Sequence, residues 1–259
     1  MRPTNIFLTA ILSMLFIIPA LAQYDMTAQE VVEAAYHRPT GEDMTAELEM
    51  ILINRQGDRR VREIKQFGKD FGDVEKTIMF FLSPADVRNT SFMNWSYDEA
   101  KDDDQWIYLP ALKRVRRISG DSKSDYFMGS DFTYDDLGDR HSEDDEHTIL
   151  RLEEIDGVES YVIESIPKDK DYMYSRTVTW IAKDKWIALK REFYDDRGEY
   201  LKTLRVKEYD NIQGYWTILH SEMENEQRQH RTVMQFKNLE YDTGVSENMF
   251  TERMMTRGL

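Results

Sequence analysis

The sequence contains no cysteine among its 259 residues. The chain therefore forms no disulfide, even in an oxidising compartment, and its fold depends on its core alone. It also cannot carry the lipid that is attached to the cysteine of a lipoprotein. The five histidines show no H-E-x-x-H or similar spacing, so the sequence predicts neither a metal site nor a bound cofactor.

Long apolar runs are absent except at the N-terminus, where Arg2 precedes an apolar stretch over residues 6–18 and an Ala20-Leu21-Ala22 site. This pattern predicts a secretory signal peptide over residues 1–22, cleaved after Ala22. The run is short for a membrane span of about 20 residues, although an uncleaved anchor is the alternative. We therefore expect a periplasmic protein that is not inserted in a membrane after cleavage.

Basic residues are in deficit, with 34 Lys and Arg against 49 Asp and Glu, and a formal net charge of −15. This balance argues against a nucleic-acid partner and against charge-driven binding to anionic membranes. The sequence also has no G-x-S-x-G elbow and no glycine-rich loop that would cradle a phosphate. We expect a protein that is not an enzyme.

What the chain does contain is a long series of short strand patterns. A helix is expected over residues 27–36, because Thr27 and Glu30 form a capping box ahead of an amphipathic stretch. Thirteen strands then follow at intervals of about 8–12 residues, which is typical of a meander that forms a curved sheet or barrel. Without a linker or repeat, residues 23–259 are predicted to form a single, mainly β domain. The expected strands are 44–52, 60–67, 74–82, 92–97, 106–109, 113–118, 148–155, 161–166, 174–181, 186–194, 200–209, 216–224 and 231–239.

The stretch 102–140 carries the most distinctive motif. The run W-I-Y-L-P-A-L-K-R-V-R-R-I predicts a hairpin that turns at Pro110. The run G-S-D-F-T-Y-D-D-L follows, and predicts a short helix over residues 131–138 that begins at Ser130 or Asp131 and stops at Gly138. We expect this helix to close over the sheet as a lid through Phe132, Tyr134 and Leu137.

These two runs resemble the signature of the LolA-like outer-membrane lipoprotein-sorting family, and more narrowly its periplasmic branch associated with RND-type transporters. The resemblance covers the chain from about Thr27 to the C-terminus. It implies a strongly curved antiparallel sheet, or half-open β-barrel of the LolA/LppX type, with a few short helices covering the open side. It also implies an apolar cavity for lipid or lipoprotein acyl chains, with an inner-membrane RND-type transporter as donor.

Alternating apolar residues on the expected strands are the candidates for this cavity because of the resemblance, whereas their pattern alone favours an ordinary core between sheet and helix. Methionine suits an adaptable apolar surface because it is unbranched and polarisable. The candidates are Met44, Leu48, Met50, Leu52, Met79, Phe81, Trp106 and Tyr108.

The three arginines of the hairpin could have either of two roles. Arg114 and Arg116 share one face of their strand and Arg117 lies on the other. They could form cross-strand ion pairs, or lie at the cavity mouth and bind a lipid phosphate or the lid. The acidic residues around them lack the spacing of a calcium loop, and we expect a solvated surface with helix-capping carboxylates.

Two functions follow from these observations. The first is a periplasmic carrier that binds lipoprotein acyl chains or another lipid and shuttles them toward the outer membrane. The second is a non-enzymatic sensor or adaptor, RseB-like or accessory to a transporter, that binds a protein partner.

Overall fold

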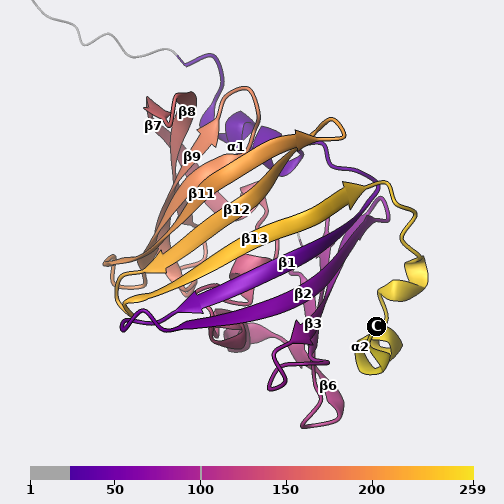
Figure 1. The fold of residues 1–259 in the computed structure, drawn as a ribbon. Coiled ribbons are helices and arrows are strands. Elements are labelled where there is room, and N and C mark those ends of the chain that lie inside the picture. The colour runs from indigo at the N-terminus through magenta and orange to yellow at the C-terminus, as the bar shows by residue number, and fades with distance from the viewer. Residues whose placement is uncertain (1–23, 100) are drawn as a thin grey trace, which may run out of the picture.

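A computed structural model describes residues 24–99 and 101–259 of the chain, and the expected signal peptide lies outside these residues. Within them, 13 strands form one antiparallel sheet in the order β6-β5-β4-β3-β2-β1-β13-β12-β11-β10-β9-β8-β7 (Figure 1). Strands β1 to β6 lead from the middle of the sheet to one edge. Strands β7 to β13 start at the other edge and return to the middle, where β13 pairs with β1.

The strand bounds follow the predicted series closely, and the meander with a strongly curved sheet is confirmed. The strands are β1 Asp43–Ile53, β2 Arg59–Asp70, β3 Val74–Ser83, β4 Ser91–Tyr97, β5 Asp104–Leu109, β6 Arg114–Ile118, β7 Asp145–Ile155, β8 Val158–Pro167, β9 Tyr174–Ala182, β10 Ala188–Asp195, β11 Tyr200–Ile212, β12 Tyr215–Asn225 and β13 His230–Tyr241.

Few helices accompany the sheet. The α-helices are α1, Ala28–Tyr36, and α2, Glu252–Arg257, and 3₁₀ turns lie at Gly120–Ser124, Phe127–Gly129, Asp135–Leu137, Ser142–Asp144 and Glu247–Met249. Helix α1 begins with the predicted capping box between Thr27 and Glu30. In the described part of the chain, no helix combines the length and the hydropathy that a membrane span requires.

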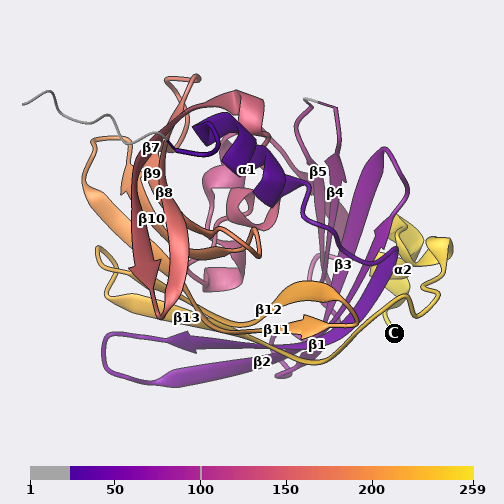
Figure 2. The same ribbon diagram turned by 90° about the horizontal axis from the view of Figure 1, so that it is seen from above.

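The curved sheet has a concave and a convex face, and each is covered by a different segment. Figure 2 shows α1 and the segment between β6 and β7 inside the curve, and α2 outside it. We call residues 119–144, which connect β6 to β7, the lid segment. The concave face buries an apolar cluster that includes Phe81, Phe92 and Ile107 together with side chains of the lid segment.

The convex face of β3 to β6 is covered by the C-terminal tail. Phe250 and Met255 of the tail are at most 2% exposed and pack against Phe80 and Met93. Asp43 fixes the start of the tail, because its carboxylate accepts hydrogen bonds from the backbone N–H groups of Thr243 at 2.8 Å and Val245 at 2.9 Å. Strands β3 to β5 are therefore covered on both faces, whereas the arginines of the edge strand β6 stay exposed.

The lid segment differs from the helix predicted over residues 131–138. Only Asp135–Leu137 forms a 3₁₀ turn, which begins with a reciprocal pair of hydrogen bonds between Thr133 and Asp136. A helix cannot begin at Asp131, because the backbone N–H and the carboxylate of that residue both bind Thr232 of β13. Tertiary hydrogen bonds thus replace the intrahelical ones that the sequence suggested.

Candidate functional site

The lid segment is fastened to the concave face through Asp131, whose side chain is fully buried. Its carboxylate accepts a hydrogen bond from the Thr232 hydroxyl at 2.7 Å and lies 2.6 Å from His230 Nδ1. Arg228 reaches the same place and donates to the Ser130 carbonyl at 3.0 Å. The sequence suggested that the acidic residues of this region form a solvated surface. The Asp131 carboxylate is instead buried and anchors the lid segment to the sheet.

A second anchor lies beside it, where the fully buried Lys202 of β11 approaches the lid segment. Its ammonium group donates to the Asp136 carboxylate at 2.5 Å and to the Asp131 carbonyl at 3.0 Å. The hydroxyl of Tyr174 donates to the other oxygen of Asp136 at 2.9 Å. A buried lysine is tolerated only with such partners, because an unpaired ammonium in the interior costs several kcal/mol, on the order of 3–5.

Against β3 to β5 the lid segment packs through aromatic side chains. Phe127 and Tyr134 lie over Phe92, with ring centroids 5.1 and 5.8 Å away, and Phe81 lies 5.9 Å from Phe127. Gly138 passes so close to the Asp103 carboxylate that a side chain there would collide with it. This close approach requires the glycine that the sequence suggested as a helix stop.

The candidate cavity residues of β1 and β3 lie in this packed region. Leu48, Met50, Leu52, Met79 and Phe81 all belong to the concave cluster, which also contains side chains of the lid segment, and they are at most 8% exposed. Their side chains therefore form a solid core wherever the lid segment lies on them. Met44 is partly buried and lies next to Gly68.

Strand β5 shows the opposite alternation to the one we expected. Ile107 points into the concave cluster, whereas Trp106 and Tyr108 belong to the convex cluster under the C-terminal tail. The rings of Trp106 and Trp95 pack edge to face, with centroids 5.1 Å apart. The placement of Trp106 and Tyr108 in the cavity is thus corrected, because the tail offers these large side chains apolar burial on the other face.

The arginines of β6 lie at the edge of the sheet and are exposed. Arg117 forms an ion pair with Asp104 of β5, in agreement with the cross-strand interpretation. Arg116 lies close enough to the Tyr134 hydroxyl to oppose the rise that burial causes in the pKa of that group. Arg114 is exposed at the start of the strand.

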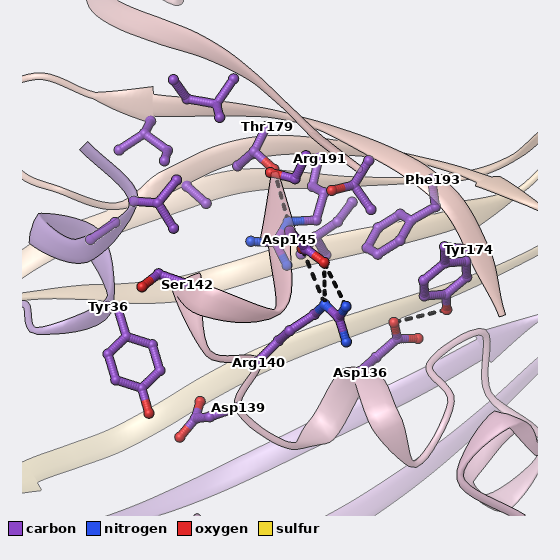
Figure 3. A pocket seen from close by; sticks show the side chains of 18 of the residues that line it. Tyr36, Asp136, Asp139, Arg140, Ser142, Asp145, Tyr174, Thr179, Arg191 and Phe193 are labelled. Atoms are coloured by element: carbon purple, nitrogen blue, oxygen red, sulfur yellow. Dashed lines mark hydrogen bonds and ion pairs between the residues drawn. The ribbon is translucent and has the colours of Figure 1, made fainter. Parts of the chain in front are cut away.

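An open cavity of about 310 Å³ lies elsewhere on the concave face, between α1, the lid segment and strands β7 to β10 (Figure 3). Its size is at the lower end of the range of about 300–1,000 Å³ that is typical of ligand pockets. The apolar part of its wall comes from α1, from strands β8 to β12 and from the turn between β9 and β10. These residues are Val32, Ala35, Ile163, Ile181, Trp186, Phe193, Leu204, Ile218 and Met223.

The polar part of the cavity wall contains several charged groups. Arg140 Nε donates to both carboxylate oxygens of Asp145, at 3.0 and 3.1 Å, and its guanidinium lies over the ring of Tyr172. The hydroxyl of Tyr172 donates to Asp135, and burial raises the pKa of that carboxyl. Of the residues predicted for the site, only Phe132 contributes to this wall.

A second, polar cavity of about 610 Å³ lies between the end of α1 and strands β3 and β4. Arg38, Glu75, Asp139 and Leu137 line it, and burial together with the charge of Asp139 raises the pKa of Glu75 to about 7. Its polar wall does not suit an acyl chain. Nowhere in residues 24–99 and 101–259 do three or more His, Asp or Glu residues form a group that could hold a metal ion.

Lys202, His230 and Thr232, which hold the lid segment, and Arg191 and Val32, which line the cavity, were not predicted from the sequence. One signal was available for Arg191 and Lys202. Each is a cation that lies two residues before an inward apolar residue of the same strand: Phe193 follows Arg191 on β10, and Leu204 follows Lys202 on β11. An inward cation needs a partner inside the protein.

The fold and its covered concavity define a class of protein, a half-open barrel that encloses segments of its own chain. An outer membrane lipoprotein-sorting protein domain from Vibrio parahaemolyticus is similar, with 37% identity and a TM-score of 0.83 over 89% of this chain and 98% of that one. A DUF1329 family protein from Desulfovibrio piger has 33% identity and a TM-score of 0.82, over 88% and 97% of the two chains.

A LolA superfamily protein from Nitrosomonas europaea shares the fold at 22% identity, with a TM-score of 0.66 over 87% of this chain and 98% of that one. A family model described as "Uncharacterized protein" matches residues 73–257, and no curated protein matches the sequence. The chain belongs to the DUF1329 family, and it shares its fold with the LolA superfamily protein.

Proposed function

We propose that the protein is a periplasmic carrier that binds acyl chains of a lipoprotein or another lipid in its concavity and takes them toward the outer membrane. The name of the Vibrio parahaemolyticus relative, a lipoprotein-sorting domain, supports this class of function and a periplasmic location. A transporter of the inner membrane would act as donor, as the resemblance to transporter-associated relatives suggests.

The observation that carries the proposal is the open cavity beneath α1 and the lid segment. Its apolar wall offers a place for methylene groups, and burial of each stabilises a complex by about 0.8 kcal/mol. The cavity is too small for several chains, so a larger cargo requires the covering segments to move. Lipid then replaces the aromatic side chains of the lid segment on the concave face.

The lid segment is suited to such a movement because of how it is attached. Charged and hydroxyl groups fasten it at Asp131 and Asp136, while Phe127, Phe132 and Tyr134 provide apolar contacts. Acyl chains can make the same apolar contacts with the sheet. Exchange of lid side chains for lipid therefore preserves the apolar burial of the concave face, and its free-energy cost is small compared with exposing that face to water.

The test is mass spectrometry of organic extracts from natively purified protein. We expect stoichiometric lipid in the parent and less in Leu137→Asp, because the charge is placed beneath the lid segment. Leu112→Asp is the matched control, since Leu112 is 53% exposed in the turn between β5 and β6.

Lipid-free parent protein, or equal lipid recovery from the parent and both variants, contradicts the carrier function. A protein that purifies without lipid but with a bound protein partner supports the adaptor function instead.

A further inference from the structure

In the described part of the chain, two arginines line the cavity without an ion pair and with donors that no protein group accepts: Arg38, just after α1, and Arg191 of β10. Arg191 is the one that lies on the sheet beside the apolar wall. Its Nε donates to the Thr179 hydroxyl at 3.0 Å. Within the described residues its two Nη groups donate to no acceptor, and it forms no ion pair. Figure 3 shows Arg191 and Thr179 on neighbouring strands at the wall of the cavity.

The strand register explains why the guanidinium points into the cavity. Arg191 and Phe193 are two residues apart on β10 and share the concave face. Arg191 is paired with Thr179 of β9 on one side and with Leu204 of β11 on the other. It therefore lies at a boundary, with a hydroxyl on one side and an apolar wall on the other.

The neighbouring carboxylates are already neutralised by other groups. Asp145 is bound by Arg140 through two nitrogens, and Asp136 is bound by Lys202 and Tyr174. These acids contribute to the field around Arg191 but their oxygens accept hydrogen bonds from closer donors. The four N–H donors of its Nη groups therefore remain available in the cavity to an anion, which would accept charge-assisted hydrogen bonds from them.

We infer that Arg191 binds the anionic head group of a single-chain amphiphile, a carboxylate or a phosphate monoester, whose chain lies along the apolar wall of the cavity. The guanidinium fork matches the geometry of either oxyanion and can donate two parallel hydrogen bonds. The chain would contact Ile163 and Ile181 of the sheet and Val32 of α1. This inference rests on the proposed carrier function and specifies the cargo.

The cargo so defined differs from the acyl groups of a lipoprotein, whose ester and amide linkages carry no negative charge. The guanidinium of Arg191 would add affinity for an amphiphile with an ionised head group. It would also set how deeply the chain of that amphiphile lies in the cavity. The cavity volume of about 310 Å³ is compatible with one chain and not with several.

The experiment compares three probes of equal chain length on delipidated parent protein: dodecanoate, dodecyl phosphate and dodecan-1-ol. Binding is followed by tryptophan fluorescence, since Trp186 lines the cavity, and by calorimetry. We expect at least one of the anionic probes to bind about tenfold more tightly than the alcohol, the effect of one to two charge-assisted hydrogen bonds. Acetate and inorganic phosphate, the head groups alone, should bind far more weakly.

Two variants locate the effect. Arg191→Gln should reduce the affinity for the preferred anion about tenfold and leave that for the alcohol unchanged, whereas Arg191→Lys should restore part of it. Arg205→Gln is the matched control, because Arg205 is exposed on the neighbouring strand β11 and should behave as the parent.

The outcomes separate the inference from the function on which it rests. If the parent binds the alcohol and both anions equally, or if folded Arg191→Gln keeps the parental preference, the head-group site is wrong and the carrier remains. If no probe with a chain binds, the carrier function fails as well. The parental comparison decides the inference even if Arg191→Gln does not fold.

Discussion

Strands β2 to β6 and strands β7 to β10 belong to one sheet but are covered differently. The first group is packed on its concave face by aromatic residues of the lid segment and on the convex face of β3 to β6 by the C-terminal tail. The second group leaves a cavity on its concave face, with Arg191 and other polar groups in its wall. We call these the filled half and the hollow half.

The difference shows where a ligand can enter without first displacing the protein's own side chains. In the filled half, ring-to-ring contacts such as Phe92 with Phe127 occupy the space. In the hollow half, α1 covers the sheet through small residues such as Ala35 and leaves room beneath it. A first chain is expected in the hollow half, and the filled half becomes accessible only when the lid segment moves.

The largest expected effect concerns the ion pair between Lys202 and Asp136, which fastens the lid segment at the boundary of the two halves. Lys202→Met leaves a buried carboxylate without its cation, and should lower the free energy of unfolding by about 3–5 kcal/mol. Urea denaturation measures this loss. Lys207→Met is the control, because Lys207 is exposed on the same strand. A loss below about 1 kcal/mol in Lys202→Met would show that the aromatic contacts of the filled half hold the lid segment without this ion pair.

A matched pair of isoleucines tests the filled and hollow halves directly. Ile107 is 2% exposed within the packed cluster, so Ile107→Ala should lower the free energy of unfolding by about 2–5 kcal/mol. Ile218 of β12 lines the cavity of the hollow half from the adjoining part of the sheet, and Ile218→Ala should cost only about 1 kcal/mol, because part of its surface already lacks neighbours. Equal losses in the two variants would mean that the halves do not differ in packing.

An effect smaller than that of Lys202→Met or Ile107→Ala is expected at Asp43, whose hydrogen bonds hold the start of the C-terminal tail against the sheet. Burial acts to raise the pKa of Asp43, but hydrogen bonds from Thr243 and Val245 outweigh it and lower the pKa below the ordinary value. The stabilisation is therefore present above the unfolded pKa of about 3.9, and is lost as pH falls through the lower folded pKa.

At neutral pH, Asp43→Asn should cost about 1–3 kcal/mol and should flatten the acid limb of the stability curve. Stability measured by urea denaturation between acid and neutral pH tests both statements. Asp73→Asn, at an exposed turn, should change neither. An unchanged acid limb in Asp43→Asn would show that other carboxylates hold the tail in place.

Much of the fold was predictable because it depends on local patterns. Alternation of apolar and polar residues and turn signals such as Asp156-Gly157 define a series of strands whatever their partners are. The capping box of α1 is equally local. The site was less predictable: Leu48, Met50 and Phe81, which were candidates for the cavity wall, lie in the buried concave cluster together with side chains of the lid segment.

The sequence by itself determined the succession of strands along the chain, the meander of antiparallel neighbours and the motif that covers the sheet, because these depend on the spacing of residues along the chain. Tertiary structure alone decided which face Trp106 and Tyr108 occupy, since both faces of β5 are buried and its alternation has no polar side. It also decided where the cavity lies and that Arg191 points into it. Those features depend on contacts between segments far apart in the sequence, such as Lys202 with Asp136, and no local pattern encodes the space that such contacts leave open.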